Sequence, residues 1–538
     1  MIQQQFLLNM KKLFLSALMA FSGLTVVQAQ DTYLNDRVTN NSDIIGTARY
    51  VGMGGAMGAL GGDLSVISNN PAGLGLYRRS DAALTMGGLF QDDEPARGDD
   101  KGRFTFDQIG FVVACPIGDD QVKFVNFGFN YQKKINYGHS LLTQQNLGGL
   151  SQCDMFAWMA GDLEKLDNLG NHASFSNPMY DDLMAAGMFQ LSSDGSAFTN
   201  GWRGNTGIFS RSTSGGLYGY EFNISGNVSD RYYWGLTFGV DKLDYQADAI
   251  YEEQPMPGGV AYRLYQSQRL EGNGVNIKLG TIIRPIEESP LRFGLAIETP
   301  TWYRLKHRAT YGISVADATG KLPAPYVSNE DNYLEYNVYS PWKFRASIGS
   351  TIDNFMAWDI EYQYSLNDYT KMGYPKSYDG YDGEASLSMD KDRDMQAMTH
   401  ASMQGVHNLR LGMEYKPIQG MFVRCGYNFF SAPFKKTGRL DQKVGSYALD
   451  YATSTDYINL GSTSIFSLGL GLRGKHFYAD IAYKYRYQRG DFYAFDDHFT
   501  SQDGNFISNN PTLSGASLTP VEVNLDRHNI AVTLGYKF

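Results

Sequence analysis

Cysteine is scarce in this chain of 538 residues. Only three cysteines occur, Cys115, Cys153 and Cys425. An odd and widely spaced set of this kind does not form the disulfide framework that staples a small secreted domain. We therefore expect a fold that is stable without an essential disulfide.

Long apolar runs and an excess of positive charge are also missing. After residue 29, no run reaches the ~18 to 20 apolar residues that a membrane-spanning helix needs, so the chain either stays soluble outside the cytoplasm or crosses a membrane with strands. The 46 basic and 56 acidic residues give a net charge of −10. This balance excludes the basic stripe that binds nucleic acid, and we expect no nucleic-acid partner.

The N-terminus has the pattern of a secretory signal peptide. Lys11 and Lys12 precede an apolar run that closes on a small-residue cleavage site ending at Ala29. No cysteine follows this site directly, so a lipoprotein anchor is not expected. The sequence thus predicts a signal peptide over residues 1–29 and export from the cytoplasm.

Aromatic residues and glycine, by contrast, are abundant. The chain has 37 Tyr, 31 Phe and 59 Gly, while charged residues make up only 19%, a mix typical of strands that face lipid on one side. From residue 80 onward, apolar and polar residues alternate with period two, which is the signal of strands. In the last segment, Ile530, Val532 and Leu534 would face one way, and Asn529 and Thr533 the other. One face suits lipid and the other suits water.

We predict an all-β fold, a transmembrane antiparallel β-barrel of fourteen strands over residues 81–538. The strands are expected at 81–91, 104–117, 122–136, 216–229, 232–251, 263–286, 290–314, 333–352, 355–369, 404–417, 420–432, 460–474, 476–489 and 526–538. A soluble sandwich would also show alternation. However, connections after even-numbered strands are short and those after odd-numbered strands are long, which is the rim asymmetry of outer-membrane barrels. We expect a monomer in the lipid of the cell outer membrane, with both termini on the periplasmic side.

The longest connection, residues 137–215, carries helical features. Apolar residues recur there at helical spacing, and an N-cap residue followed by proline is typical of a helix start. We expect one or two short helices over the extracellular mouth. The aromatic residues Phe156, Trp158 and Phe189 would either form a capture surface for a hydrophobic ligand or hold the loop helices down, and the sequence leaves both possibilities open.

A glycine-rich segment precedes the first strand. Residues 46–76 read GTARYVGMGGAMGALGGDLSVISNNPAGLGL, without a pattern long enough to fold alone. The barrel lumen is the obvious place for such a segment, since glycine lets the backbone approach a wall closely. Its run of residues 69–74, NNPAGL, followed at once by the first strand, resembles the Asn-Pro-Ala signature of the FadL family of outer-membrane channels.

The resemblance implies an N-terminal hatch in the lumen, here within residues 30–80, of which residues 30–45 are an extension beyond the family pattern. Members of the family take up hydrophobic molecules, long-chain fatty acids or aromatic hydrocarbons, through a lumen pocket and a sideways opening at a kinked third strand. Asn70, Pro71 and Ala72 would be the hatch signature near that opening. The residues to which the resemblance gives a hatch or gating role are Gly54, Gly58, Asn70, Pro71, Ala72 and Gly73.

Two functions follow from this resemblance. The leading hypothesis is a channel for uptake of hydrophobic small molecules, fatty acid-like or hydrocarbon, with a lateral exit that avoids charged lumen walls. Such a protein would retain lipid or detergent in its lumen. The alternative is a FadL-like barrel that acts as a protein-interaction component of secretion or surface assembly, as PorV-like members do in type IX secretion. It would have outer-membrane or secretion partners.

No motif indicates an enzyme, and we expect no catalytic residue and no cofactor. The glycine run at residues 52–58 lacks the strand and helix that a phosphate-binding loop requires. Asp359 and Glu361 stand two apart, as paired carboxylates for acid-base chemistry would. On an inward face they are more often partners of lumen cations such as Arg345 or Arg410.

Metal-binding patterns are equally weak. None of the eight histidines, His400 and His407 included, stands at a metal-ligand spacing from carboxylates or thiols. Asp390, Asp392 and Asp394 alternate as in a calcium loop, but the glycine and the closing Glu of that motif are missing. We expect no metal site, and we interpret residues 374–403 as a solvated loop without regular structure.

Overall fold

The fold is that of a computed structural model, which describes most of the chain after residue 31. The described residues are 32–40, 42–92, 101–118, 121–166, 171–193, 195, 197–255, 261–317, 321–328, 332–375, 389–440, 452–497 and 517–538. The predicted signal peptide lies outside them.

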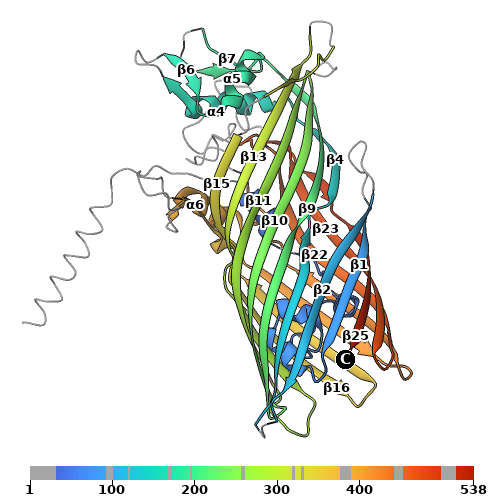
Figure 1. Cartoon of the computed structure of the whole chain (residues 1–538). Coiled ribbons are helices and arrows are strands. Elements are labelled where there is room, and N and C mark those ends of the chain that lie inside the picture. The colour runs from blue at the N-terminus through green and yellow to red at the C-terminus, as the bar shows by residue number, and fades with distance from the viewer. Residues whose placement is uncertain are drawn as a thin grey trace, which may run out of the picture.

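The strands form one closed antiparallel barrel (Figure 1). Its fourteen wall positions are, in chain order, β1 (Asp81–Gln91), β2 (Gly102–Pro116), β3 (Val122–Asn136) continued by β4 (His139–Asn146), β9 (Gly204–Val228), β10 (Tyr232–Pro255), β11 (Tyr262–Ile283), β12 (Arg292–Glu298) with β13 (Trp302–Val315), β15 (Asn332–Tyr339) with β16 (Lys343–Ile352), β17 (Met356–Ser365), β20 (Val406–Tyr415), β21 (Met421–Phe430), β22 (Tyr457–Arg473), β23 (Phe477–Tyr493), and β24 (Val521–Asn524) with β25 (Arg527–Lys537). Strand β1 pairs with β25 from Asp81↔Lys537 to Gln91↔Arg527, which closes the ring.

The fourteen predicted strands are confirmed, and the differences lie where the alternation is interrupted. The seventh predicted strand breaks into β12 and β13 around Pro300, and the eighth into β15 and β16 around Pro341. Proline has no N–H to donate to the ladder, so it interrupts a strand. Strand β9 begins at Gly204, well before the predicted start, because its first half is rich in Gly, Ser and Thr and shows no clear alternation.

The two faces of the wall differ as predicted. On β25, Ile530, Val532 and Leu534 are exposed on the outer face, while Ala531 and Thr533 are buried toward the lumen. The outer faces of the other strands carry a similar band of exposed Leu, Ile, Val and Phe side chains. An apolar band around a barrel with a polar interior is the surface that lipid requires.

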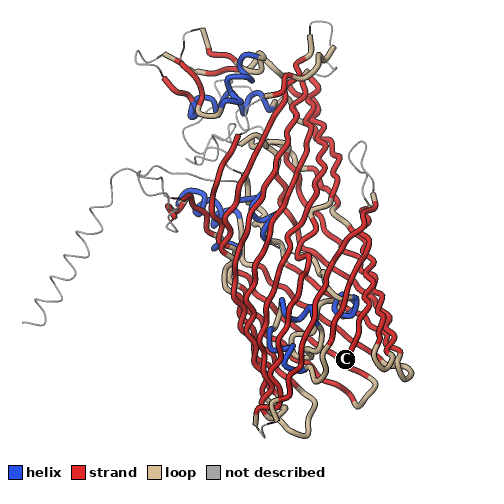
Figure 2. Tube along the Cα trace, viewed as in Figure 1, coloured by secondary structure: helices blue, strands red, loops and turns tan. Residues whose placement is uncertain are grey.

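Helices are few and short (Figure 2). They are α2 (Thr32–Thr39), α3 (Ala48–Gly52), α4 (Gln152–Leu163), α5 (Pro178–Ala185) and α6 (Arg393–Ser402), with 3-10 turns η1 (Leu64–Ser68), η2 (Pro71–Leu76) and η3 (Asn367–Tyr369). Within the described part of the chain, none is both long and apolar enough to cross a membrane.

The two rims differ in the way the connection lengths predict. Short turns lie at the rim near the C-terminus, such as the one through Ser229 and Asp230, both with positive φ. The loop helices lie beyond the opposite rim (Figure 1). There α4 and α5 pack with the small hairpins β5 (Glu164–Leu166) to β6 (His172–Phe175) and β7 (Gln190–Leu191) to β8 (Phe198–Thr199).

The interpretation of residues 374–403 as an irregular loop is wrong in its second half. Short strands β18 (Lys371–Pro375) and β19 (Met389–Lys391) pair with each other, and β14 (Tyr326–Val327) pairs with β13 nearby. Helix α6 follows, capped by Asp392, whose Oδ1 accepts from the Met395 backbone N–H at 2.8 Å. The aspartate that resembled a calcium ligand is therefore a helix cap.

Candidate functional site

The segment of residues 44–77, hereafter the lumen segment, lies inside the lower half of the barrel (Figure 2). Its hydrogen bonds reach strands around the whole ring. The bonds with the wall include Ala48 N to Thr533 Oγ1 (2.7 Å), Arg49 Nε to Glu414 Oε2 (3.0 Å), Ser65 Oγ to Gln108 Oε1 (2.7 Å), Arg292 Nη1 to Leu60 O (3.0 Å) and Asn126 Nδ2 to Leu74 O (2.7 Å). The segment is therefore fixed to the wall rather than resting loosely in the lumen.

The signature residues begin η2. Asn70 is the N-cap, its Oδ1 accepting from Ala72 N at 3.2 Å, while Pro71 occupies the first helical position, where no N–H is needed. The Asn70 amide also donates to Gly58 O (2.8 Å) and to Thr281 O (3.2 Å). One asparagine thus shapes the turn and ties it both to the rest of the segment and to β11.

Two wall glycines let the signature approach this closely. A Cβ on Gly235 of β10 would lie 2.3 Å from the carbonyl carbon of Pro71, and one on Gly280 of β11 would lie 2.1 Å from Asn70 Oδ1. Real Cβ contacts are never that short, so only glycine permits this approach. The turn η2, which the signature residues begin, packs against β9, β10 and β11. Ser68, just before the signature, donates to Gln132 of β3 at 3.0 Å.

The other glycines singled out from the sequence are packed as well. Gly54 has φ +63° and lies against the backbone of Gly426 on β21. Gly73 faces another residue of the lumen segment, and an added Cβ would lie 2.5 Å from Val66 Cγ1. A large side chain at Gly73 would therefore deform the lumen segment instead of narrowing a passage.

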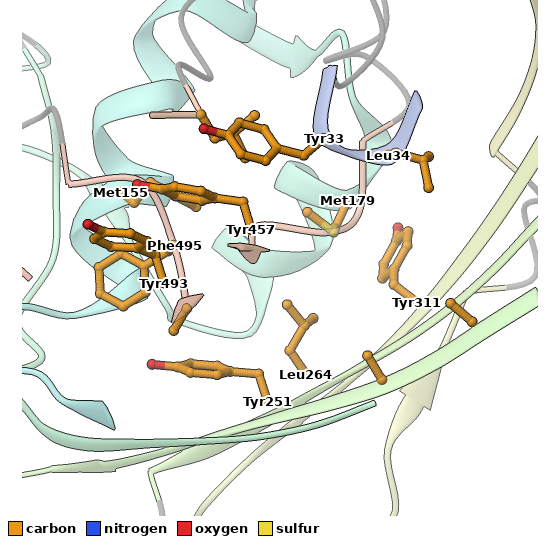
Figure 3. Close-up of a cluster of buried hydrophobic side chains, with 14 of the residues drawn as sticks. Tyr33, Leu34, Met155, Met179, Tyr251, Leu264, Tyr311, Tyr457, Tyr493 and Phe495 are labelled. Atoms are coloured by element: carbon orange, nitrogen blue, oxygen red, sulfur yellow. The ribbon is translucent and has the colours of Figure 1, made fainter. Parts of the chain in front are cut away.

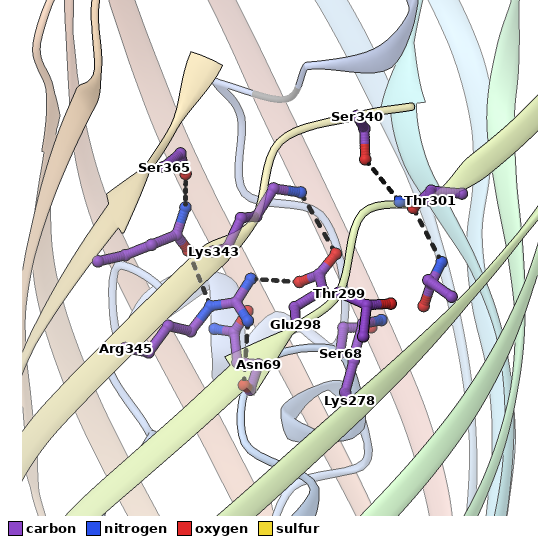
Figure 4. Close-up of polar contacts among 12 residues, drawn as sticks. Ser68, Asn69, Lys278, Glu298, Thr299, Thr301, Ser340, Lys343, Arg345 and Ser365 are labelled. Atoms are coloured by element: carbon purple, nitrogen blue, oxygen red, sulfur yellow. Dashed lines mark hydrogen bonds and ion pairs between the residues drawn. The ribbon is translucent and has the colours of Figure 1, made fainter. Parts of the chain in front are cut away.

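Ion pairs between wall strands line the lumen beside this segment, and Figure 4 shows those around Glu298. Glu298 accepts from Arg345 Nη2 at 2.7 Å and from Lys343 Nζ at 3.3 Å. Lys278 pairs with Glu221, and Arg410 with Glu361. The expectation that Glu361 serves a lumen cation is thus confirmed.

Asp359 has a different role from Glu361. Its Oδ2 accepts from the backbone N–H groups of Ala59 and Leu60, both at 2.9 Å. It therefore anchors the lumen segment rather than a cation.

The wall is interrupted between its second and third strands. Strand pairing of β2 with β3 ends at Gln108↔Gln132. Beyond it, β2 still pairs with β1 as far as Gly102, and β3 and β4 still pair with β9. Between residues 102–107 and 133–146, all of them described, no strand pairing joins the two sides.

Side chains alone bridge this interruption. Lys133 Nζ donates to Thr105 Oγ1 at 3.2 Å, and Arg103 Nη1 donates to Thr213 O at 2.8 Å. At its upper end, the Gln91 side chain exchanges two hydrogen bonds with the Ser140 backbone, at 2.9 and 3.0 Å. The third strand also carries a bulge before Ile135 and breaks between β3 and β4.

A cavity of about 160 Å³ lies directly behind the interruption. Asn136, Tyr137 and His139, at the break in the third strand, line one side of it. The charged side chains that line it are Arg37, Arg211, Arg486, Arg527, Asp36 and Asp43. Among the described residues, no group of three His, Cys, Asp or Glu side chains is placed to hold a metal.

Known proteins are similar to this chain in fold rather than in sequence. No family model matches it, and no curated protein matches it. A FadL homologue of Pseudomonas aeruginosa aligns over 92% of this chain and 99% of its own, with a TM-score of 0.52 and 11% sequence identity. The chain has the FadL-type fold.

Two toluene transporters are also similar. TbuX of Ralstonia pickettii aligns over 92% of this chain and 98% of its own, with 13% identity and a TM-score of 0.45. TodX of Pseudomonas putida aligns over 92% of this chain and 99% of its own, with 10% identity and a TM-score of 0.46.

In this FadL-type barrel the N-terminal extension contributes Tyr33 and Leu34 to a large cluster of buried hydrophobic side chains (Figure 3). Helix α2 is almost wholly buried there. Tyr33 stacks on Phe434 with ring centroids 4.4 Å apart, lies 5.0 Å from the Tyr457 ring, and donates to Asn459 Oδ1 at 2.8 Å. The resemblance implies a lumen position for residues 30–45 as part of the hatch region, but no sequence pattern indicates these contacts.

The loop aromatics belong to the same buried cluster. Phe156 is fully buried and meets the Tyr180 ring edge-on at 5.7 Å, and Phe189 is buried beside Phe198 at 5.8 Å. Trp158 is partly buried against the cluster. Phe156 and Phe189 therefore pack within the loop, and a capture role, for which Trp158 keeps a partly exposed ring, stays a prediction.

Proposed function

We propose that this chain is a FadL-family channel of the outer membrane that takes up hydrophobic small molecules and releases them sideways through its wall. The observation that carries the proposal is the interruption between β2 and β3–β4, with a cavity directly behind it. The FadL-type fold and the apolar outer band support it.

The path straight down the barrel is unfavourable for an apolar solute. It would have to pass the paired charges around Glu298 and Glu221 and the lumen segment. An apolar molecule gains nothing from these groups, and separating the buried pairs to make room would cost several kcal/mol each. In our proposal the lumen segment, including Gly54, Gly58 and residues 70–73, acts as a hatch that seals this path.

The sideways path meets less resistance. Only side chains bridge the wall there, so opening it breaks no ladder of backbone hydrogen bonds. Moving the ends of Lys133 and Arg103 would uncover a route from the cavity to the hydrocarbon of the bilayer. An apolar solute that leaves this way goes directly into the phase in which it is most stable.

The experiment joins the two sides of the interruption reversibly. Thr105→Cys and Lys133→Cys are introduced together, with Cys115 and Cys425 replaced by Ser, and the new thiols are linked by a reducible bis-maleimide. Uptake of radiolabelled oleate and toluene is then measured in cells that carry the variant in place of their own channels. We expect uptake to fall at least tenfold and to return after reduction.

The matched control places the same link where the wall is already continuous. Ile109→Cys and Tyr131→Cys replace directly paired residues of β2 and β3. This linked variant should take up both solutes at the original rate. Undiminished uptake in the linked Thr105–Lys133 variant would refute lateral passage.

A protein-interaction role is the second candidate, and the folded extracellular loop favours it. Strands β9, β10 and β11 have 25, 24 and 22 residues, about twice the ~9 to 11 that cross a bilayer. They carry the loop helices well beyond the lipid. Replacing residues 152–203 by a short Gly-Ser linker should leave uptake intact if the protein is an importer, and should abolish secretion or surface assembly if it is an assembly component.

A further inference from the structure

A broad apolar depression, hereafter the rim depression, lies on the outer face of the barrel close to the chain end marked C in Figure 1. It has a volume of about 950 Å³ and spans β2, β1, β25, β23 and β22, which are consecutive in the wall. Its exposed lining includes Phe111, Ile418, Leu472, Phe477, Leu534 and Tyr536. The rim depression therefore belongs to the surface that faces lipid, and it is separate from the lumen.

Two small residues account for its shape. Ala82 of β1 is paired with Phe111 of β2 on one side and with Tyr536 of β25 on the other. Ala479 of β23 is paired in the same way with two leucines, one on β25 and one on β22. A small side chain between two large neighbours leaves a hollow in the face of a sheet. Because the side chains around it are apolar, hydrocarbon fills this hollow more favourably than water does.

Basic residues border the rim depression on the side of the short turns. Arg473 lines it, and Lys475 follows in the same turn. Arg79 donates to the backbone O of Lys537 at 3.3 Å, and Lys537 Nζ lies 3.8 Å from Asp81 Oδ2. Arg79 and Lys475 are exposed, and neither forms an ion pair with a described carboxylate. Their charges are therefore available to a partner from outside the chain.

The ion pairs of Arg473 also leave positive charge in excess. Asp480 accepts from Arg473 Nη1 and from Arg424 Nη1, both at 2.7 Å. Glu414 is shared in turn between Arg424 and Arg49. In this network three arginines are joined to two carboxylates, so a further anion at Arg473 would be attracted rather than repelled.

We propose that the rim depression binds an anionic glycerophospholipid of the membrane, with its acyl chains on the apolar lining and its phosphate at Arg473, Arg79 and Lys475. Arginine and lysine form charge-assisted hydrogen bonds with phosphate oxygens. Basic side chains next to an apolar transmembrane surface recognise anionic lipid head groups. The bound lipid lies across the pairing of β1 with β25 that closes the barrel. The proposal goes beyond solute uptake and does not depend on lateral passage.

A second depression on the outer face offers an internal comparison. It has a volume of about 600 Å³ and lies over β11, β12, β16 and β17. Its one charged lining residue, Arg345, is paired with Glu298 at 2.7 Å. The described residues that line it thus offer no unpaired cation. This second depression should hold acyl chains without selecting their head group.

The test titrates the purified full chain, in a neutral detergent, with dioleoyl phosphatidylglycerol or dioleoyl phosphatidylcholine. The two lipids have the same acyl chains, and native mass spectrometry gives the dissociation constant of each. The variants are Arg79→Gln, Lys475→Gln, both together, and the charge-retaining Lys475→Arg. Arg231→Gln is the matched control, since it removes a cation from the turn between β9 and β10 at the same rim.

Two further variants test the apolar part of the site. Ala82→Phe fills the rim depression, and Ala346→Phe fills the second depression from an exposed position on β16. Both residues face outward, so neither substitution disturbs the lumen. Inorganic phosphate is added as a competitor, because it has the charge of the head group without the acyl chains.

We expect the unaltered protein to bind phosphatidylglycerol at least tenfold more tightly than phosphatidylcholine. Each single glutamine variant should weaken phosphatidylglycerol binding by about fivefold and the double variant by about 25-fold, with little change for phosphatidylcholine. Lys475→Arg should retain the affinity. Ala82→Phe should weaken binding of both lipids, whereas Ala346→Phe should leave the preference for phosphatidylglycerol intact.

Four outcomes would overturn the proposal. The first is equal affinity of the unaltered protein for the two lipids, and the second is an effect of the double glutamine variant no larger than that of Arg231→Gln. The third is displacement of phosphatidylglycerol by inorganic phosphate at equal concentration, which would indicate a site for free phosphate. The fourth is a lipid-free dimer as the main species, which would assign the rim depression to a second copy of the chain.

Discussion

Adding one methyl group at Gly235 should loosen the lumen segment without damaging the barrel. In Gly235→Ala the new Cβ would lie 2.3 Å from the carbonyl carbon and 2.4 Å from the oxygen of Pro71. Ordinary contact begins near 3.4 Å, so the segment must retreat by about 1 Å. The obstacle is backbone, which cannot rotate away as a side chain would. Overpacking of this kind costs about 1–3 kcal/mol.

Hydrogen exchange read by mass spectrometry measures this cost directly. If the penalty falls on the docking of residues 44–77, their protected amides should exchange roughly 5- to 140-fold faster, since 1.4 kcal/mol corresponds to a factor of ten. Amides of β22 and β23 should keep their rates. Gly88→Ala is the control, because its Cβ would meet the Phe90 ring at 3.1 Å on the outer face and no backbone atom closer than Arg103 O at 4.0 Å. Unchanged exchange in the lumen segment of Gly235→Ala, or equal acceleration in Gly88→Ala, would refute the reasoning.

Three further changes test other parts of the structure. Burial raises the pKa of Asp154, in the capping box of α4, from 3.8 to about 6. The folded loop therefore disfavours the charged form of the Asp154 carboxyl, and its stability falls as the pH rises. The free energy of local opening of α4, measured by amide exchange, should fall by up to about 3 kcal/mol between pH 4 and pH 7. In Asp154→Asn it should not change over this range. Arg424→Met removes the buried partner of Glu414 and should lower barrel stability by about 3–5 kcal/mol in urea titration. Tyr33→Ala removes the stack on Phe434 and should free α2, seen as faster exchange there with the wall unaffected.

The strands of the barrel wall could be predicted from the sequence because each strand carries its own alternation of apolar and polar residues. Alternation along each strand is imposed by lipid on one side and water on the other, so every segment carries its own signal. The exceptions are equally local, since Pro300 and Pro341 mark the breaks in the two strands that were predicted as continuous. The helix α6 was missed because only Met395 and Met398 mark its apolar face.

The interior could be predicted only in part. The glycine-rich composition and the Asn-Pro-Ala run indicated a segment packed in the lumen. Its docking depends on pairs such as Gly235 with Pro71, whose partners are far apart in the chain. Arg486 and Arg527 face each other because of the register of β23 and β25, and a shift of one residue would turn one of them outward. No local pattern carries that information.

The lumen segment also constrains the order in which the protein can assemble. Its bond from Ala48 to Thr533 joins residues 485 positions apart, and the same segment is bonded to β2 and β3. Contacts between such distant parts of a chain form slowly. Residues 44–77 are synthesised early but can form all their wall contacts only after the last strand is in place. Once β25 has paired with β1, the barrel is closed around them. Assembly factors would have to keep residues 44–77 inside the barrel before it closes. Substitutions such as Gly235→Ala should therefore slow barrel assembly as well as weaken the docking of this segment in the folded protein.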